Sequence, residues 1–389
     1  MTIELSRRSF LAGACCLAAS PLATPVSFAA IPGDNRLVTI VLRGAMDGLA
    51  LVQPHGDPAL RSLRPKLSLT PDQGLIDLDG FFGLHPFAAE LMPLWRTNEI
   101  GFVHAISTPY RSGRSHFDGQ DMLESGGAVV QEERTGWLNR AIATIPRSSE
   151  RKAIDVNTTS ELILTGPNPV DVWSPRADLN LGLDEQAFYQ RLYRNDPAFS
   201  AAMSEAVETD LFADGIYAGE KRGSGVADVA KLTAGMLSGE HRIASFSING
   251  WDTHVGQDKT FKRPVTELCT AILTLKAQLA PDIWQKTAIL AMTEFGRTAR
   301  ENGSNGTDHG TGGLAILAGG AVAGGKVHGV WPTLKEASLL DDRDLAPTTD
   351  LRQLAAGMLY QQFGIPARDL GSRIFPGLSL DTGASYLHG

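Results

Sequence analysis

The sequence predicts a doubly wound α/β fold, in which a mostly parallel sheet carries helices on both faces. Its apolar segments are short continuous runs rather than alternating patterns, as expected for strands that are buried on both faces. These runs alternate with helical patterns along the chain, which is typical of parallel strands joined by crossover helices. The chain has 389 residues, 43% of them hydrophobic, and this is enough to build a large core.

Each predicted strand spans three to six residues and is mostly apolar. The predicted strands are residues 37–42, 100–105, 154–156, 243–248, 287–292 and 314–317. The predicted helices are residues 86–96, 116–124, 137–144, 184–195, 196–213, 226–237, 261–279 and 351–363. The fourth and fifth helices are divided at Asp196, because an aspartate followed by proline suits the start of a helix.

Residues 184–238 hold consecutive helices with no strand between them, which predicts a helical insertion on the sheet. No sharp boundary divides the rest of the chain. We therefore expect a single α/β domain over residues 30–389 that includes this insertion.

The first 29 residues have the order of a twin-arginine signal peptide. Arg7 and Arg8 precede an apolar stretch at residues 10–22, and small residues follow at Ser27 and Ala29. We expect this segment to bind the twin-arginine translocase and to be removed. The expected location is therefore the periplasm or the medium outside the cell.

Charge and hydropathy limit the partners. The formal net charge of −8 at pH 7 disfavours nucleic acid as a ligand. Beyond the leader, no segment offers about 20 consecutive apolar residues, so stable membrane insertion is not expected.

Polar clusters lie beside four of the predicted strands, and a parallel sheet binds its ligands at the carboxyl ends of its strands. Three clusters follow strands, at residues 43–48, 249–254 and 293–298, whereas residues 307–310 come just before a strand. Their carboxylates and imidazoles are ligands for divalent metals such as Zn, Mn, Mg or Ca. The candidate metal ligands are Asp47, Asp252, His254, Glu294, Asp308 and His309. Any one cluster alone also fits a plain turn.

Ser115 lies at the predicted start of a helix, where backbone N–H groups and the helix dipole suit an anion or an activated hydroxyl nucleophile. Arg111 and Arg114 would add positive charge for a phosphate or sulfate group. The alternative is that Ser115 is an ordinary N-cap with Asp118 as its partner. The local sequence leaves both interpretations open.

Taken together, these motifs resemble Domain of Unknown Function family 1501, which is itself similar to the alkaline-phosphatase-like superfamily of phosphatases and sulfatases. The resemblance extends from about residue 37 to residue 363. It rests on the leader and on residues 42–48 (LRGAMDG), 115–118 (SHFD), 250–254 (GWDTH), 293–298 (TEFGRT) and 308–310 (DHG).

The superfamily resemblance implies a two-metal site with a hydroxyl nucleophile. It implies that Asp47 is the ligand after the first strand, Asp252 and His254 are a ligand pair, and His309 is a late ligand. It also implies Ser115 as the nucleophile and His116 as an additional ligand.

The sequence departs from this pattern at residues 294 and 295, where the superfamily tends to have Asp followed by His. Glu294 replaces the aspartate, and Phe295, which replaces the histidine, cannot bind a metal. A one-metal site, an altered reaction and a lost activity therefore all remain open.

We expect an exported metal-dependent hydrolase of an anionic ester, with a small-molecule or polymer substrate that carries phosphate or sulfate. Ser115 or a water molecule would attack, and Arg111, Arg114 and Arg297 would hold the anionic group. The alternative is a non-catalytic binding or assembly protein that retains the hydrolase fold.

Overall fold

The computed structural model describes most of the chain after residue 33. The described residues are 34–111, 113–145, 153–157, 161–174, 188–189, 191–193, 196–197, 199–200, 203, 215–216, 223–381 and 383–388. The predicted signal peptide at residues 1–29 lies outside them. The predicted helices at 184–195 and 196–213, which form most of the expected insertion, also lie largely outside them.

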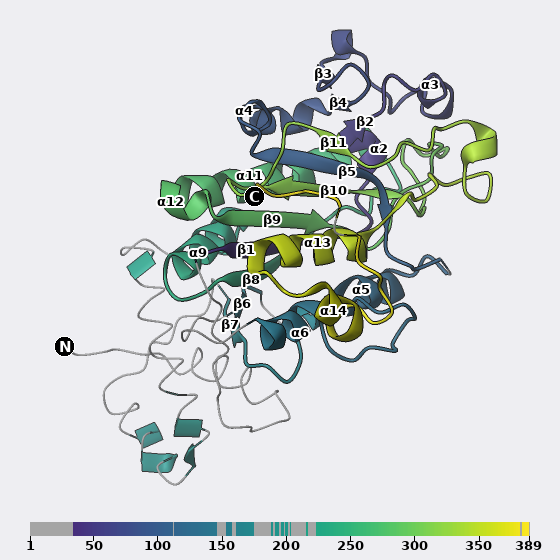
Figure 1. Cartoon of the computed structure of the whole chain (residues 1–389). Coiled ribbons are helices and arrows are strands. Elements are labelled where there is room, and N and C mark those ends of the chain that lie inside the picture. Colours follow the sequence, from purple (N-terminus) through teal and green to yellow (C-terminus); the bar gives the residue numbers. More distant parts are fainter. Residues whose placement is uncertain are drawn as a thin grey trace.

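A nine-stranded mixed sheet forms the centre of the described structure (Figure 1). The order along the sheet is β11-β5-β10-β9-β1-β8-β6-β7, and β12 also pairs with β5. The strands are β1 Arg36–Arg43, β5 Ile100–Ser107, β6 Ala153–Asp155, β7 Asp171–Val172, β8 Ile243–Asn249, β9 Thr287–Met292, β10 Gly313–Ala318, β11 Val327–His328 and β12 Thr349–Asp350. All six predicted strands are present, and the predicted α/β fold with a mostly parallel sheet is confirmed.

The short strands were not predicted. The two-residue strands β7, β11 and β12 join the main sheet, while β2 Val52–Gln53, β3 Ile76–Asp77 and β4 Gly83–Leu84 form a separate small sheet. Two residues are too few to show an apolar run, so only tertiary pairing marks these segments as strands.

Strand β10 runs antiparallel to both of its neighbours, β5 and β9. Its first residue, Gly313, therefore pairs with Ile106 near the end of β5. The segment before β10 consequently reaches the same edge of the sheet as the segments that follow β1, β5, β8 and β9. This direction brings residues 307–310 to the carboxyl edge of the parallel strands.

Helices cover both faces of the sheet, and the strand side chains alternate between two apolar clusters. Val38 and Ile40 pack with residues of α9 Val226–Ser238 and α11 Lys262–Gln278. Leu37 and Val41 belong to the cluster that includes α6 Trp137–Thr144 and α13 Leu351–Phe363. This burial on both faces explains why the strands have continuous apolar sequences.

The remaining helical segments are short. They are α2 Gly48–Leu51, α3 Leu60–Leu63, α4 Met92–Arg96, α5 His116–Ser125, α10 Gln257–Thr260, α12 Pro281–Trp284, α14 Ala367–Asp369, η1 Pro71–Gln73, η2 Pro86–Leu91, η3 Leu162–Leu164, η4 Glu336–Ser338 and η5 Leu370–Ile374. The predicted helix at 86–96 is divided into η2 and α4, because Pro93 has no N–H to continue the hydrogen-bond ladder. Among the described residues, no helix has both the length and the hydropathy needed to cross a membrane.

Candidate metal centre

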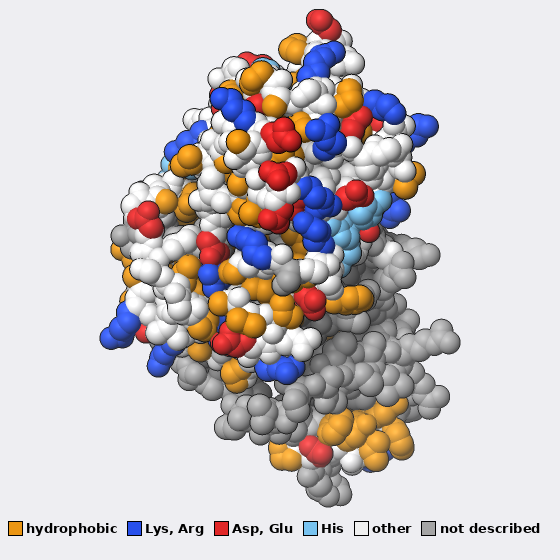
Figure 2. Space-filling model, turned by 90° about the vertical axis from the view of Figure 1, so that its right-hand side faces the viewer, with side chains coloured by type: hydrophobic (Ala, Val, Ile, Leu, Met, Phe, Trp, Pro, Cys, Tyr) orange, Lys and Arg blue, Asp and Glu red, His pale blue; other side chains and the backbone are white. Residues whose placement is uncertain are grey.

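Four side chains from three segments meet at the carboxyl edge of the sheet. Asp252 and His254 follow β8, His309 precedes β10, and His116 is the first residue of α5 after β5. Figure 2 views the molecule from the right-hand side of Figure 1 and shows histidine side chains gathered in one surface patch, beside acidic and basic ones. Residues of the clusters predicted at 249–254 and 307–310 therefore come together with His116 at one site.

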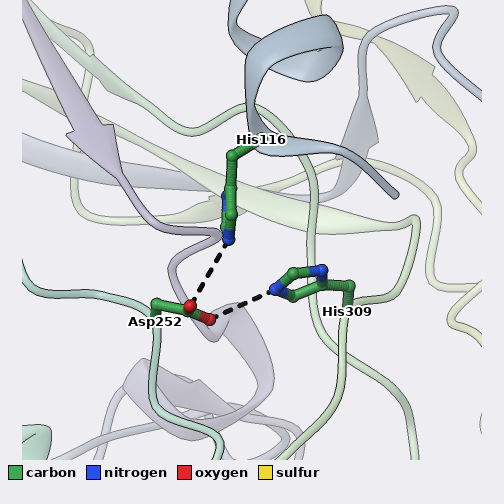
Figure 3. A group of neighbouring side chains, drawn as sticks. All are labelled: His116, Asp252 and His309. Carbon is green, nitrogen blue, oxygen red and sulfur yellow. Dashed lines mark hydrogen bonds and ion pairs between the residues drawn. The ribbon is translucent and has the colours of Figure 1, made fainter. Parts of the chain in front are cut away.

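Asp252 lies at the centre of this group, as Figure 3 shows for its contacts with His116 and His309. Its Oδ1 atom is 3.2 Å from His309 Nε2 and 3.1 Å from His254 Nε2. Its Oδ2 atom is 3.5 Å from His116 Nε2. One ligand atom each from His116, Asp252 and His309 lie within 4.8 Å of one another, so these three residues could hold a metal ion.

His254 extends this group. Its Nε2 atom lies 2.9 Å from His309 Nε2, and both atoms face the same carboxylate oxygen of Asp252. Two imidazole nitrogens therefore lie close to each other and to one carboxylate oxygen.

The other ring nitrogen of each histidine has a hydrogen-bond partner. The Nδ1 atoms of His116 and His254 lie 2.7 Å and 3.2 Å from carboxylate oxygens, and Nδ1 of His309 lies 3.0 Å from a backbone carbonyl oxygen. The partner of His116 is Glu294, and the partner of His254 is Asp308. The carbonyl oxygen that contacts His309 belongs to Arg114. Partners of this kind fix the tautomer and orientation of metal-binding histidines. They hold all three Nε2 atoms toward Asp252.

The predicted ligands Glu294 and Asp308 thus lie behind imidazole rings rather than among the atoms that converge. The two oxygens of Glu294 also accept hydrogen bonds from Gly44 N at 2.9 Å and Thr293 Oγ1 at 2.9 Å. Burial raises the pKa of Glu294, but its hydrogen bonds, chiefly that with His116, lower it below the usual value. The same hydrogen bond raises the pKa of His116.

Arg297 is buried beneath the site. It donates hydrogen bonds to Asp252 Oδ1 at 2.7 Å and to the backbone oxygens of Gly44, Ala45 and Thr307 at 2.7, 2.7 and 2.9 Å. Burial raises the pKa of Asp252, and the hydrogen bond and charge of Arg297 bring it below the usual value. Arg297 was predicted to hold a substrate anion, and its guanidinium instead ties the site loops together.

The other predicted anion-binding arginines contact protein groups. Arg111 donates to the backbone oxygens of Thr108 and Tyr110 at 2.6 and 2.8 Å. Arg114 makes one long contact, 3.4 Å, with Asp344, and 42% of its side chain is exposed. The guanidinium of Arg114 is therefore accessible to a ligand, whereas that of Arg297 is fully buried.

Ser115 is the N-cap of α5, as the alternative interpretation of the sequence predicted. Its Oγ atom accepts a hydrogen bond from the backbone N–H of Asp118 at 3.4 Å. Ser115 still lies next to His116 in the chain, at the positive end of the helix dipole.

Asp47 does not belong to the converging group. Its carboxylate is fully buried and accepts hydrogen bonds from Arg64 at 2.7 Å and Gln257 at 2.6 Å. The sequence did not identify Arg64 and Gln257 as site residues, because neither belongs to a polar cluster at a strand end.

Phe295 forms one wall of the site. Its ring stacks on His116 with centroids 5.3 Å apart and lies 5.1 Å from the His309 ring. The aromatic side chain therefore occupies the space beside these two histidines.

The fold and the site define an α/β protein with a mostly parallel sheet and a histidine and aspartate group, able to hold a metal, at the carboxyl edge. Residues 105–373 match the family described as "Protein of unknown function (DUF1501)", and the chain belongs to this family. The matched range includes His116, Asp252, His254 and His309, but not Asp47. No curated protein matches the chain.

Proposed function

We propose that the protein is an exported, metal-dependent hydrolase of a phosphate or sulfate ester. The observation that carries this proposal is the orientation of three imidazoles toward one carboxylate, each fixed by an acceptor at its Nδ1 atom. With its Nδ1 atom donating to this acceptor, each neutral imidazole directs the lone pair of its Nε2 atom toward the carboxylate, and a cation bound there would stabilise this arrangement.

The ligands in this proposal are Nε2 of His116, His254 and His309 together with the carboxylate of Asp252. His116 Nε2 is itself buried and has no hydrogen-bond partner, while its Nδ1 atom contacts Glu294. A metal ion would satisfy this nitrogen. Three imidazoles and one carboxylate favour Zn²⁺ or Mn²⁺ over Ca²⁺ and Mg²⁺, which prefer oxygen ligands.

A divalent ion at this position would polarise an ester oxygen and lower the pKa of a water molecule. Asp252, held by Arg297, would keep the ligand set in place. The exposed guanidinium of Arg114, whose own carbonyl contacts His309, is the group best placed to bind the substrate anion. Ser115, at the start of α5, is the protein's own candidate nucleophile, and water is the other.

Phe295 favours a second candidate function, that of a non-catalytic binding or assembly protein with one structural metal. Phe295 stacks on His116 and cannot bind a metal, so a two-ion site of the kind that supports many ester hydrolases would be short of one ligand here. The two proposals differ in whether Asp252 is needed for turnover or only for metal content.

The test combines metal analysis with assays of generic aryl phosphate and aryl sulfate esters. We expect the purified full chain to contain about one equivalent of metal and to hydrolyse one of the two ester types, and Asp252→Ala to lose both properties. Asp282→Ala, an exposed change at α12, is the matched control and should retain both. Absence of bound metal in the wild type would refute the proposal, and bound metal without turnover would favour the non-catalytic alternative.

Export through the twin-arginine route is also part of the proposal. It rests on Arg7 and Arg8 and on the apolar stretch that follows them. Replacing both arginines with lysine should retain the protein inside the cell, as measured by fractionation and immunoblotting. Unchanged export of the lysine variant would contradict this route.

A further inference from the structure

We propose that Asp47 and Gln257 are positioning residues, which set the distance between the two loops that carry Asp252, His254 and His309. This inference rests on the metal site of the proposed function. It assigns Asp47 a role behind the ligands, in place of the ligand role that its position after the first strand suggested.

Gln257 joins the two loops directly. Its Oε1 atom accepts hydrogen bonds from Thr253 Oγ1 at 2.9 Å and from Thr307 Oγ1 at 2.8 Å. Thr253 lies between the ligands Asp252 and His254 in the chain, and Thr307 lies two residues before the ligand His309. One amide oxygen therefore fixes the spacing of the two ligand-bearing loops.

Asp47 fixes Gln257 in turn. The Asp47 Oδ2 atom accepts a hydrogen bond from Gln257 Nε2 at 2.6 Å, which orients the amide so that its oxygen faces the two threonines. The same Oδ2 atom accepts a hydrogen bond from Arg64 at 2.7 Å. Arg64 also donates to the backbone oxygens of Thr298 and Ala299 at 2.6 and 3.0 Å, so the loop after β9 joins the same network.

Every side chain in this buried polar network is shielded from water. The network consists of Asp47, Arg64, Thr253, Gln257 and Thr307, each of which is at most 2% exposed. Hydrogen bonds in such surroundings are stronger than at the surface and leave no water to replace a lost partner. The network is therefore suited to holding the loops at one spacing, whether or not metal is bound.

Removing the hydroxyl groups of Thr253 and Thr307 is the most specific way to test the network. Thr253→Val combined with Thr307→Val removes both contacts to Gln257 and preserves the shape of the side chains, while Ser at both positions keeps the hydroxyls. Thr287→Val is the matched control, because Thr287 is a buried threonine with one hydroxyl contact, to the backbone oxygen of Ile283, at the opposite end of β9.

The experiment has two readouts on the full chain. The first is amide hydrogen exchange of residues 252–257 and 306–310 without metal, which we expect to be faster in the double valine variant and unchanged in the serine variant and the Thr287→Val control. The second is Co²⁺ binding followed by visible absorption. We expect the double valine variant to bind about 10- to 100-fold more weakly, with an altered spectrum, and the serine variant to resemble the wild type.

Unchanged exchange in the double valine variant would overturn the positioning role, as would a wild-type Co²⁺ affinity and spectrum. Equal changes in the Thr287→Val control would also overturn it, since they would reflect general destabilisation. If the wild type binds no Co²⁺, the proposed metal site fails, while hydrogen exchange still decides whether the network holds the loops.

Discussion

Ser115 has two roles that substitutions can separate: it is the N-cap of α5 and the candidate nucleophile. As the N-cap of α5, it needs only a side-chain oxygen that accepts the N–H of Asp118. As a nucleophile, it needs a hydroxyl group. Asparagine and aspartate meet the first demand and not the second, so substitutions can separate the two roles.

We expect Ser115→Ala to lower the free energy of unfolding by about 1 kcal/mol, because the cap is lost. Ser115→Asn should restore most of this stability. Urea denaturation measures the stability, and ester hydrolysis measures the function. Loss of hydrolysis in both variants would identify Ser115 as the nucleophile, whereas activity retained in Ser115→Asn would assign the attack to water.

At the scale of elements, the loops after β1 and β8 approach each other so closely that a side chain does not fit between them. Gly44 has a φ of +116°, and a Cβ atom there would lie 2.7 Å from the backbone nitrogen of Asp252. Gly250 has a similar φ of +97°, but a Cβ atom there would have no neighbour within 4 Å. Substitutions at the two glycines therefore distinguish the effect of backbone strain, which both share, from the effect of a steric clash, which occurs only at Gly44.

Gly250→Ala should cost roughly 1 to 3 kcal/mol of stability through strain alone and leave metal affinity near that of the wild type. Gly44→Ala carries the same strain and also displaces the backbone of Asp252, so we expect at least about a tenfold loss of metal affinity. Denaturant unfolding and Co²⁺ titration provide the two measurements. Equal metal affinities in the two variants would show that the loop contact does not position Asp252.

The elements themselves could largely be predicted, whereas their directions could not. Apolar runs marked β1, β5, β8 and β9 because each strand is buried on both faces. The antiparallel direction of β10 could not be predicted from its sequence, because a short apolar run does not indicate in which direction a strand pairs with its neighbours. Only its pairing with β5 and β9 explains why His309, which precedes a strand, meets residues that follow strands.

At the scale of the whole molecule, buried histidines connect stability to pH. His104 is fully buried in β5, its Nε2 atom contacts the backbone oxygen of Val52 at 2.9 Å, and burial lowers its pKa to about 4. Burial also lowers the pKa values of His85 and His328 to about 4. All three lie outside the metal group.

Well above pH 6.5, these histidines are neutral in the folded and unfolded states, and their effect on stability is constant. Between pH 6.5 and 4, the unfolded chain binds protons that the folded chain does not, so the free energy of unfolding should fall as the pH is lowered. One such histidine contributes a slope of up to about 1.4 kcal/mol per pH unit.

His104→Gln should therefore reduce the slope of unfolding free energy against pH in this window by up to about 1.4 kcal/mol per unit. Denaturant unfolding at several pH values between 4 and 7 measures the slope. The glutamine amide can still donate to Val52, which limits the loss of stability at neutral pH. An unchanged slope would show that His104 is not the group that takes up the proton.

The sequence by itself determined the α/β class, the main strands and helices, and most of the residues that surround the site. These features depend on local apolar runs and on the positions of polar clusters at strand ends. The tertiary structure alone decided what each polar side chain does. Asp47 binds Gln257 and Glu294 binds His116 across 210 and 178 residues of chain, and no local pattern encodes which partner a carboxylate meets at such separations.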